Sequence, residues 1–220
     1  MTRRAAYTPP QEVQMITRPE PMLLRAITTR CSARAFSSDP VPSPTIGRIL
    51  EAGRRAPSGA NQQPWRFIVI REPDSKRAIR SACEAAERRI HRDVDEPLRS
   101  WMQERRITDD KPFLEQAPVL IAVFVEPRSP YAVPSVWIAI AFMLLQIEEE
   151  DLSSLPYTPS GAAVHALLGV PEQLVLAAIL PVGRSLQREA QPRKRVSDVV
   201  SLERYDRPYP EPSSVPPGTT

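Results

Sequence analysis

The stretch of residues 135–147 constrains the fold more than any other part of the sequence. Almost every side chain in it is apolar, so a helix over these residues would have no polar face to turn toward water. A helix of that kind has to be covered on all sides. In a chain of 220 residues, the size of one domain, a subunit interface is a natural place for it. We therefore expect this helix to lie between two copies of the chain.

Hydrophobic periodicity predicts further helices and strands on both sides of that stretch. The predicted helices cover residues 22–29, 44–55, 74–92 and 162–168, and the predicted strands cover 65–70, 119–125 and 174–182. In the helix 74–92, a stripe that includes Ile79, Cys83 and Ile90 is expected to be buried. Strands separated by long helices indicate an α+β sheet flanked by helices.

The ends of the chain differ in composition from this middle part. We expect an N-terminal arm over residues 1–21, one domain over residues 22–200, and a proline-rich C-terminal tail over residues 201–220. Residues 95–110 hold a weaker amphipathic pattern, which suits either a lid or a surface helix. Residues 148–151 are four acids at the end of the apolar helix, where the helix dipole disfavours negative charge. The sequence offers no reason for them beyond exposure to solvent.

Charge and cysteine content exclude several classes of function. The net charge is +3 and the basic residues are scattered, which argues against a dedicated nucleic-acid binder. Two cysteines and two histidines show no metal-ligand spacing, so no metal site is expected. Residues 1–21 have no apolar core of the signal-peptide type, and the apolar run 136–145 is too short to span a bilayer. We expect a cytoplasmic protein without a membrane partner.

Residues 55–65 are more specialised than a connection between a helix and a strand requires. Two prolines bracket small and polar residues, and Gly59 permits backbone angles that other residues resist. Ser58 and Asn61 offer neutral hydrogen-bonding groups, and Trp65 adds a large ring with one N–H. The pattern alone is compatible with a functional loop or with a plain turn.

Two other groups of residues carry possible chemistry. Arg30 and Arg34 lie four apart with Ser32 between them, which suits an anion because guanidinium groups bind phosphate oxygens bidentately. The alternative is a solvated basic turn. Glu87 and His91 share one face of the helix 74–92, and the alternative there is an ordinary surface pair.

The stretch 56–65, which reads A-P-S-G-A-N-x-x-P-W, resembles the signature loop of the FMN-dependent nitroreductase family. Within that family it looks most like the iodotyrosine deiodinase-like branch. The resemblance extends over about residues 23–200. It implies a nitroreductase-like α+β fold with a central, mostly antiparallel sheet flanked by helices. It also implies a homodimer with a buried interface helix, in agreement with the apolar stretch 135–147.

The resemblance implies FMN as the cofactor. In the family pattern, Arg30 and Ser32 face the phosphate and Arg34 lies nearer the pyrimidine edge, while Cys31 replaces a second arginine that is often found there. Thr158 falls where the branch directs a hydroxyl at flavin N5, and we assign it the catalytic role; on its own it could be a turn threonine before proline. The implied cofactor-binding set is Arg30, Cys31, Ser32, Arg34, Pro57, Ser58, Gly59, Tyr157, Thr158 and Arg193, with Arg193 reaching the phosphate from its own chain or from the partner.

The branch also suggests a substrate site for the amino-acid part of a halotyrosine. Glu87 and Lys111 match its first and last residues by position, and the lid 95–110 between them has a similar length. His91 stands where the pattern has a tyrosine. A zwitterion needs an anion for its ammonium and a cation for its carboxylate, which this pair would supply. The predicted substrate-binding residues are Ala60, Glu87, His91 and Lys111.

The sequence therefore favours an FMN-dependent oxidoreductase that uses electrons from NAD(P)H. Its substrates would be nitro-aromatic, quinone or halogenated aromatic compounds. NAD(P)H would bind transiently, because the chain has no G-x-G-x-x-G fingerprint for a tightly held dinucleotide. FMN would carry the redox chemistry, and no side chain is nominated as an acid–base catalyst. The alternative is a non-catalytic flavin-binding protein that acts as a carrier or sensor.

Overall fold

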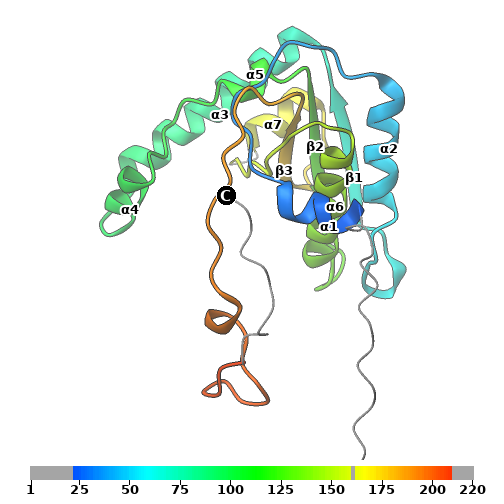
Figure 1. Cartoon of the computed structure of the whole chain (residues 1–220). Helices are drawn as coiled ribbons and strands as arrows, with labels where there is room; N and C mark the ends of the chain where they lie inside the picture. Colours follow the sequence, from blue (N-terminus) through cyan, green and yellow to red (C-terminus); the bar gives the residue numbers. More distant parts are fainter. Residues whose placement is uncertain (1–21, 160–161, 210–220) are drawn as a thin grey trace, which may run out of the picture.

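The computed structural model describes residues 22–159 and 162–209, and its centre is a three-stranded antiparallel sheet (Figure 1). The strands are β1 (Trp65–Ile70), β2 (Val119–Val125) and β3 (Val175–Val182), and β2 lies between the other two. Every residue of β2 is buried, because helices cover both faces of the sheet. This double cover explains why β2 is apolar throughout and does not alternate with polar residues. The predicted α+β fold with an antiparallel sheet is confirmed.

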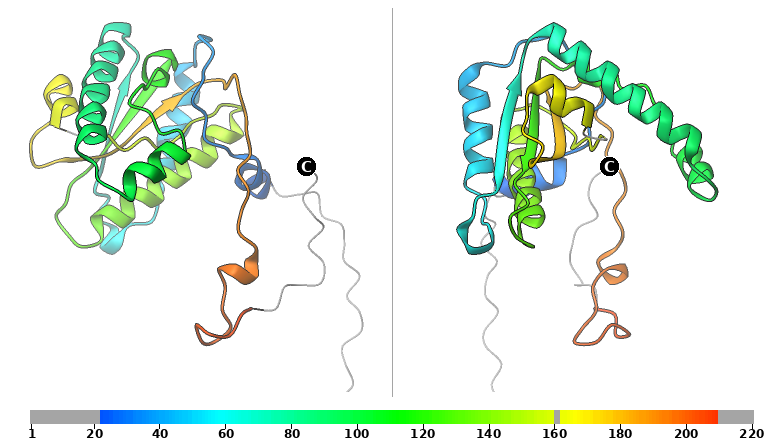
Figure 2. Two further views of the ribbon diagram at one scale, coloured as in Figure 1. Left: turned by 90° about the vertical axis from the view of Figure 1, so that its left-hand side faces the viewer. Right: turned by 180° about the vertical axis from the view of Figure 1, so that it is seen from behind.

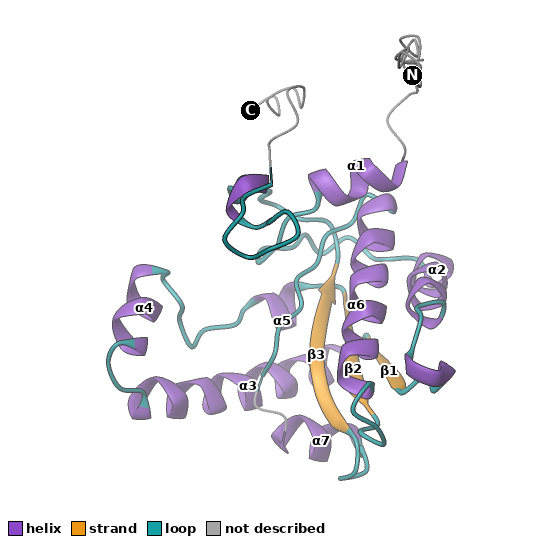
Figure 3. Cartoon of the chain, turned by 90° about the horizontal axis from the view of Figure 1, so that it is seen from below, coloured by secondary structure: helices purple, strands orange, loops and turns teal. Residues whose placement is uncertain are grey.

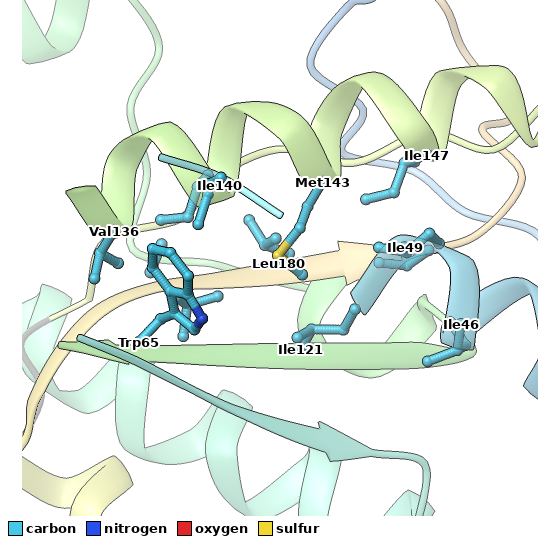
Figure 4. Packing of buried hydrophobic residues seen from close by; sticks show 14 of the residues in the cluster. Ile46, Ile49, Trp65, Ile121, Val136, Ile140, Met143, Ile147 and Leu180 are labelled. Carbon is cyan, nitrogen blue, oxygen red and sulfur yellow. The ribbon is translucent and has the colours of Figure 1, made fainter. Parts of the chain in front are cut away.

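Alternate residues of β2 belong to two separate cores, as the twofold side-chain period of a strand requires. Ile121 and Val123 face α2 (Ser43–Arg54) and α6 (Ala132–Glu149). Figure 4 shows Ile121 and Leu180 packed under Ile140 and Met143 of α6. Leu120 and Phe124 face the opposite core, which α3 (Pro73–Asp93), α5 (Phe113–Gln116) and α7 (Ala162–Leu168) close.

Helix α6 is buried on one side and open on the other within a single chain (Figure 3). Its buried residues pack against the sheet and α2, whereas Trp137, Ile138 and Phe142 are 38–39% exposed. A single chain therefore covers one side of α6. The expected cover on the other side would have to come from a second copy. Among the described helices, α6 is long and apolar enough to cross a bilayer by length and composition, so the apolar helix is longer than the run 136–145 indicated. Within this chain, 39% of it is buried.

Arginines from distant segments pair with the acids that end α6. Arg48 of α2 forms two hydrogen bonds with Glu150, each 2.6 Å long, and these lower the pKa of that carboxyl. Arg188 pairs with Glu148, which also accepts a hydrogen bond from Thr29 at the end of α1 (Met22–Thr29). Tertiary ion pairs thus provide the reason for Glu148 and Glu150 that the sequence did not offer.

Two segments project from this body (Figure 2). The far half of α3 extends beyond the sheet and leads to α4 (Leu98–Glu104), within the predicted lid. This is why Ile90, which was expected in a buried stripe, is 46% exposed while Ile79 and Cys83 are 1% exposed. The second projection follows β3 and includes the short helix η2 (Val196–Asp198). The predicted arm 1–21 lies outside the described residues, as do residues 210–220 of the predicted tail.

Candidate active site

A cavity of about 840 Å³ lies on the side of the molecule formed by α3, the segment after α4 and the segment before α7. Its volume is within the range of small-molecule and cofactor sites. Five separate segments of the chain contribute to it. The lining residues are Ser32, Arg34, Glu87, Glu104, Arg105, Arg106, Ile107, Thr108, Asp110, Lys111, Phe113, Leu155, Pro156, Tyr157, Thr158, Glu189 and Gln191.

Backbone pairing brings the segment with Ser32 and Arg34 together with the segment that ends in Thr158. Ser32 forms a parallel bridge with Ser154, and the backbone N–H of Ala33 donates to the Ser154 carbonyl at 3.2 Å. Tyr157 forms an antiparallel bridge with Ile179 of β3. The segment that ends in Thr158 therefore lies along the edge of the sheet, with Ser32 and its neighbours beside it.

Glu87 is the centre of the charged part of the cavity. One carboxylate oxygen, Oε1, accepts a hydrogen bond from the Tyr157 hydroxyl at 2.8 Å. The other oxygen, Oε2, lies 3.8 Å from Lys111 Nζ and 3.7 Å from His91 Nε2. The side chains of Glu87 and Lys111 are 15% and 10% exposed, so their charges are screened less than those of surface pairs. The carboxylate and the ammonium that a zwitterion would need are thus close together in one cavity.

Burial keeps the hydroxyl of Tyr157 and the thiol of Cys83 protonated. Burial, with the hydrogen bond to Glu87 as a second cause, raises the pKa of Tyr157, so its hydroxyl keeps its proton in neutral solution. Burial also raises the pKa of the Cys83 thiol to about 12. Cys83 therefore acts as a core residue and not as a nucleophile, as its position in the predicted helix indicated.

Lys111 is held by a network that begins one turn before Glu87 on α3. Its backbone N–H donates to Glu84 Oε1 at 2.9 Å, and its ammonium donates to the Thr108 carbonyl. Arg80 contacts the same Glu84 oxygen at 2.7 Å and Asp110 at 2.9 Å. Contacts of its backbone with Glu84 and of its ammonium with Thr108 therefore fix the position of Lys111.

The signature loop lies apart from this cavity and packs on the beginning of α6. The backbone N–H of Gly59 donates to Ser135 Oγ at 3.2 Å. A Cβ at Gly59 would come within 2.5 Å of the Tyr131 Cβ, so only glycine fits this close approach. Ala60, Asn61 and Gln63 have φ values of about +50°, which non-glycine residues adopt at a cost. Such strain in a loop points to a function for its shape.

The structure brings together part of the predicted site. Six of the predicted residues line the cavity, and the other eight do not. The first group is Ser32, Arg34, Glu87, Lys111, Tyr157 and Thr158; the second is Arg30, Cys31, Pro57, Ser58, Gly59, Ala60, His91 and Arg193. Cys31 is buried and Arg193 is exposed. His91 reaches the site through its contact with Glu87.

Sequence reasoning missed other residues of the cavity wall. Arg105 and Arg106 lie there, and the Arg105 guanidinium is 5.1 Å from the ring centre of Trp101 on α4. The amphipathic pattern of the lid contained the signal for these two arginines. Glu189 and Gln191 also line the cavity, but they follow β3 in a segment without periodicity, so no signal was present.

Comparison with known proteins identifies the family. A model of the nitroreductase family matches residues 27–184, and the chain belongs to that family. Within it, the relatives place the chain in the iodotyrosine deiodinase-like branch. It is 40% identical over 163 residues to an iodotyrosine deiodinase of Thermotoga neapolitana, a match that covers 74% of this chain and 88% of the relative. The predicted family and branch are confirmed.

Two further similarities extend this finding. The crystal structure of an oxidized iodotyrosine deiodinase bound to FMN and 3-iodo-L-tyrosine is 37% identical, with a TM-score of 0.76, and the match covers 84% of this chain and 98% of that one. An NADH dehydrogenase of Thermus thermophilus is 32% identical over 179 residues, which is 72% of this chain and 84% of the relative. The nitroreductase-like fold is confirmed.

Proposed function

We propose that this FMN-dependent oxidoreductase removes halogen reductively from an aromatic amino acid. The observation that carries the proposal is the Glu87–Lys111 pair, whose charged groups are 3.8 Å apart in the same cavity as Arg34 and Thr158. The FMN and 3-iodo-L-tyrosine bound to the 37% identical structure support the cofactor and the substrate class. Nitro-aromatic and quinone compounds are the wider set of acceptors that the family suggests.

The lining of the cavity fits FMN. Its volume of about 840 Å³ is large enough for a flavin with a ligand on its ring. Ser32 supplies a hydroxyl for phosphate oxygens, and Arg34 supplies a positive charge for the pyrimidine edge, where reduced flavin is negative. Thr158 supplies a hydroxyl donor for N5. FMN contributes the electrons of the reaction, and Arg30, Cys31 and Arg193 stay predicted contacts.

We propose a homodimer as the unit that binds FMN. The exposed apolar face of α6 gives a second copy a surface to cover, and the strained loop with Pro57, Ser58 and Gly59 is fixed at the start of the same helix. A loop in that place would reach the cavity of the partner and not its own. This arrangement would account for the separation between the loop and Arg34 within one chain.

The substrate would be held by an exchange of charged partners. Its ammonium would bind Glu87 in place of Lys111, and its carboxylate would bind Lys111 in place of Glu87. His91 lies beside the ammonium position, and Ala60 of the strained loop would contact the aromatic part. Lid residues 95–110 would exclude water when the substrate is bound.

The electron donor is a separate part of the proposal. NAD(P)H is the expected reductant, and the similarity to an NADH dehydrogenase supports it. A cytoplasmic location fits such a donor and stays a prediction.

The test begins with the colour of the purified protein. Bound FMN would make it yellow, and the mass of the extracted chromophore would distinguish FMN from FAD. The protein is then reduced with dithionite without oxygen and mixed with 3-iodo-L-tyrosine, and released iodide is measured. Release of iodide with turnover by NADH or NADPH would exclude a passive flavin carrier. Failure of the refolded protein to take up FMN would refute the proposal.

The residue assignment needs its own comparison. Glu87→Gln and Lys111→Met should each weaken binding of iodotyrosine while the protein stays yellow. Equal affinity in both variants and in the unmodified protein would show that the zwitterion binds elsewhere.

A further inference from the structure

Tyr157 connects the segment next to Thr158 with the Glu87 carboxylate. Its hydroxyl donates to Glu87 Oε1 at 2.8 Å. Its backbone exchanges two hydrogen bonds with Ile179 of β3, 3.0 and 2.7 Å long. Its ring packs edge-on against Phe113, with ring centres 5.5 Å apart. Because the backbone and the ring are both held, the position of the hydroxyl is fixed by the core of the protein.

The second carboxylate oxygen of Glu87 has a different environment. Lys111 Nζ and His91 Nε2 lie 3.8 and 3.7 Å from Oε2, which is longer than a hydrogen bond. Among the residues that the structure describes, the buried Nε2 of His91 has no hydrogen-bond partner. Buried polar atoms are normally paired. Within the described part of the chain, Oε1 thus has a hydrogen-bond donor and Oε2 has none, as expected for a site that a ligand completes.

Resting on the proposed function, we propose that Tyr157 is a positioning residue that makes the site selective for ligands with a cationic nitrogen. It holds Glu87 Oε1 and thereby keeps Oε2 available as the acceptor for the ligand's ammonium group. Tyr157 acts through Glu87 and does not itself contact that group.

The physical reason is the freedom of the glutamate side chain. The terminal torsion of glutamate is broad, so a carboxylate without a fixed donor turns easily. With the hydroxyl removed, Glu87 can turn both oxygens toward Lys111 and form a direct ion pair. A ligand's ammonium would then have to displace Lys111 from the carboxylate. A neutral aromatic ligand makes no use of Glu87, so its affinity does not depend on this competition.

The test compares two ligands on the yellow holoprotein and its Tyr157→Phe variant. The ligands are 3-iodo-L-tyrosine and ortho-iodophenol, which shares the ring and halogen but lacks the amino-acid group, and binding is followed by flavin fluorescence. The Kd for iodotyrosine should rise about tenfold in the variant, the size expected for one hydrogen bond to a charged group. The Kd for iodophenol should stay unchanged. Equal losses for both ligands, or no loss for either, would overturn the proposal.

A double-mutant cycle separates positioning from packing. In a Glu87→Gln background, removal of the Tyr157 hydroxyl should leave the Kd for iodotyrosine unchanged, because the group through which it acts has lost its charge. Additive effects of the two substitutions would show that Tyr157 works by another route.

Iodide release and the two ligand affinities together distinguish this inference from the proposed function. If the unmodified holoprotein releases iodide but Tyr157→Phe binds iodotyrosine normally, the inference alone fails. If the unmodified protein releases no iodide and binds iodotyrosine no better than iodophenol, both fail.

Discussion

The cluster around Glu87 and the signature loop differ in how much of their surroundings one chain supplies. Glu87, Tyr157 and Lys111 come from three distant segments and meet in one cavity, where contacts within the chain position them. The loop around Gly59 is held on α6 by a hydrogen bond to Ser135, yet none of its residues lines that cavity. Its contacts include Tyr131 and Ser135 at the start of α6, the helix that also carries the exposed Ile138 and Phe142.

This difference suggests a division of tasks. A single chain can prepare the part of the site that would recognise the amino-acid group, because all of its members are fixed by the sheet and by α3. The part that would hold FMN contains the loop, and that part would be complete only when two copies associate. Substitutions in the two regions should therefore affect different properties.

The largest effect is expected where the second copy would bind. Phe142→Glu places a charge on the exposed face of α6, and we expect monomers whose FMN affinity is lower by about 100-fold, as for the loss of an interface hot spot. The matched control is Leu167→Glu on α7, where an apolar residue that is 48% exposed lies on the opposite side of the sheet. Light scattering gives the oligomeric state, and absorbance gives bound flavin. A monomer that stays fully yellow would contradict the division.

Two buried lysines provide the second comparison. Lys76 donates to the carbonyls of Glu115 and Ala117 at 3.1 and 2.7 Å and does not line the cavity, whereas Lys111 lines it and faces Glu87. Lys111→Met should weaken iodotyrosine binding by about 30-fold, because it truncates one partner of a shielded charge pair.

Lys76→Met should instead lower the free energy of unfolding by about 1–3 kcal/mol, since two carbonyls lose their donor, and leave binding unchanged. Denaturant melts and fluorescence titrations measure both quantities. Equal binding losses in the two lysine variants would show that Lys111 supports the fold and not the ligand.

The sequence predicted helices and strands, which depend on local pattern. It did not predict contacts between side chains that are distant in the chain. The apolar run of β2 and the first half of α3 follow from periodicity, because burial repeats with the geometry of the element. The contact between Glu87 and Tyr157 joins residues 70 positions apart, and no local pattern records it. The same holds for Glu148 and Glu150, whose arginine partners are set by tertiary packing. Among the six predicted residues that line the cavity, Ser32, Arg34 and Glu87 were singled out by residue type and spacing. Lys111, Tyr157 and Thr158 came from the resemblance alone.

Two glycines give a third, smaller comparison. Gly59→Ala would place a methyl group 2.5 Å from the Tyr131 Cβ, so the loop has to shift. We expect a loss of about tenfold in FMN affinity with the dimer intact, from strain of about 1–3 kcal/mol. Gly47→Ala, in α2, meets nothing within 4 Å and should raise the free energy of unfolding by about 0.5–1 kcal/mol. Tighter FMN binding in Gly59→Ala would show that the loop does not need its observed shape.

The smallest expected effect is the pH dependence that Tyr157 confers. An unfolded tyrosine ionises near pH 10, whereas burial and the hydrogen bond to Glu87 raise the pKa of native Tyr157 above that value. Below that pH both states hold the proton, so this group adds no pH dependence. As the pH rises further, the unfolded state loses its proton first, and the free energy of unfolding falls until the native phenol ionises as well.

Tyr157→Phe should remove this fall and the corresponding late phase of the ultraviolet phenol titration. A late phase that persists in the variant would assign it to another tyrosine. It would also show that the Tyr157 hydroxyl is less buried than its contact with Glu87 requires. One chain would then not fix the cluster around Glu87, and the contrast with a loop that needs a second copy would be weaker.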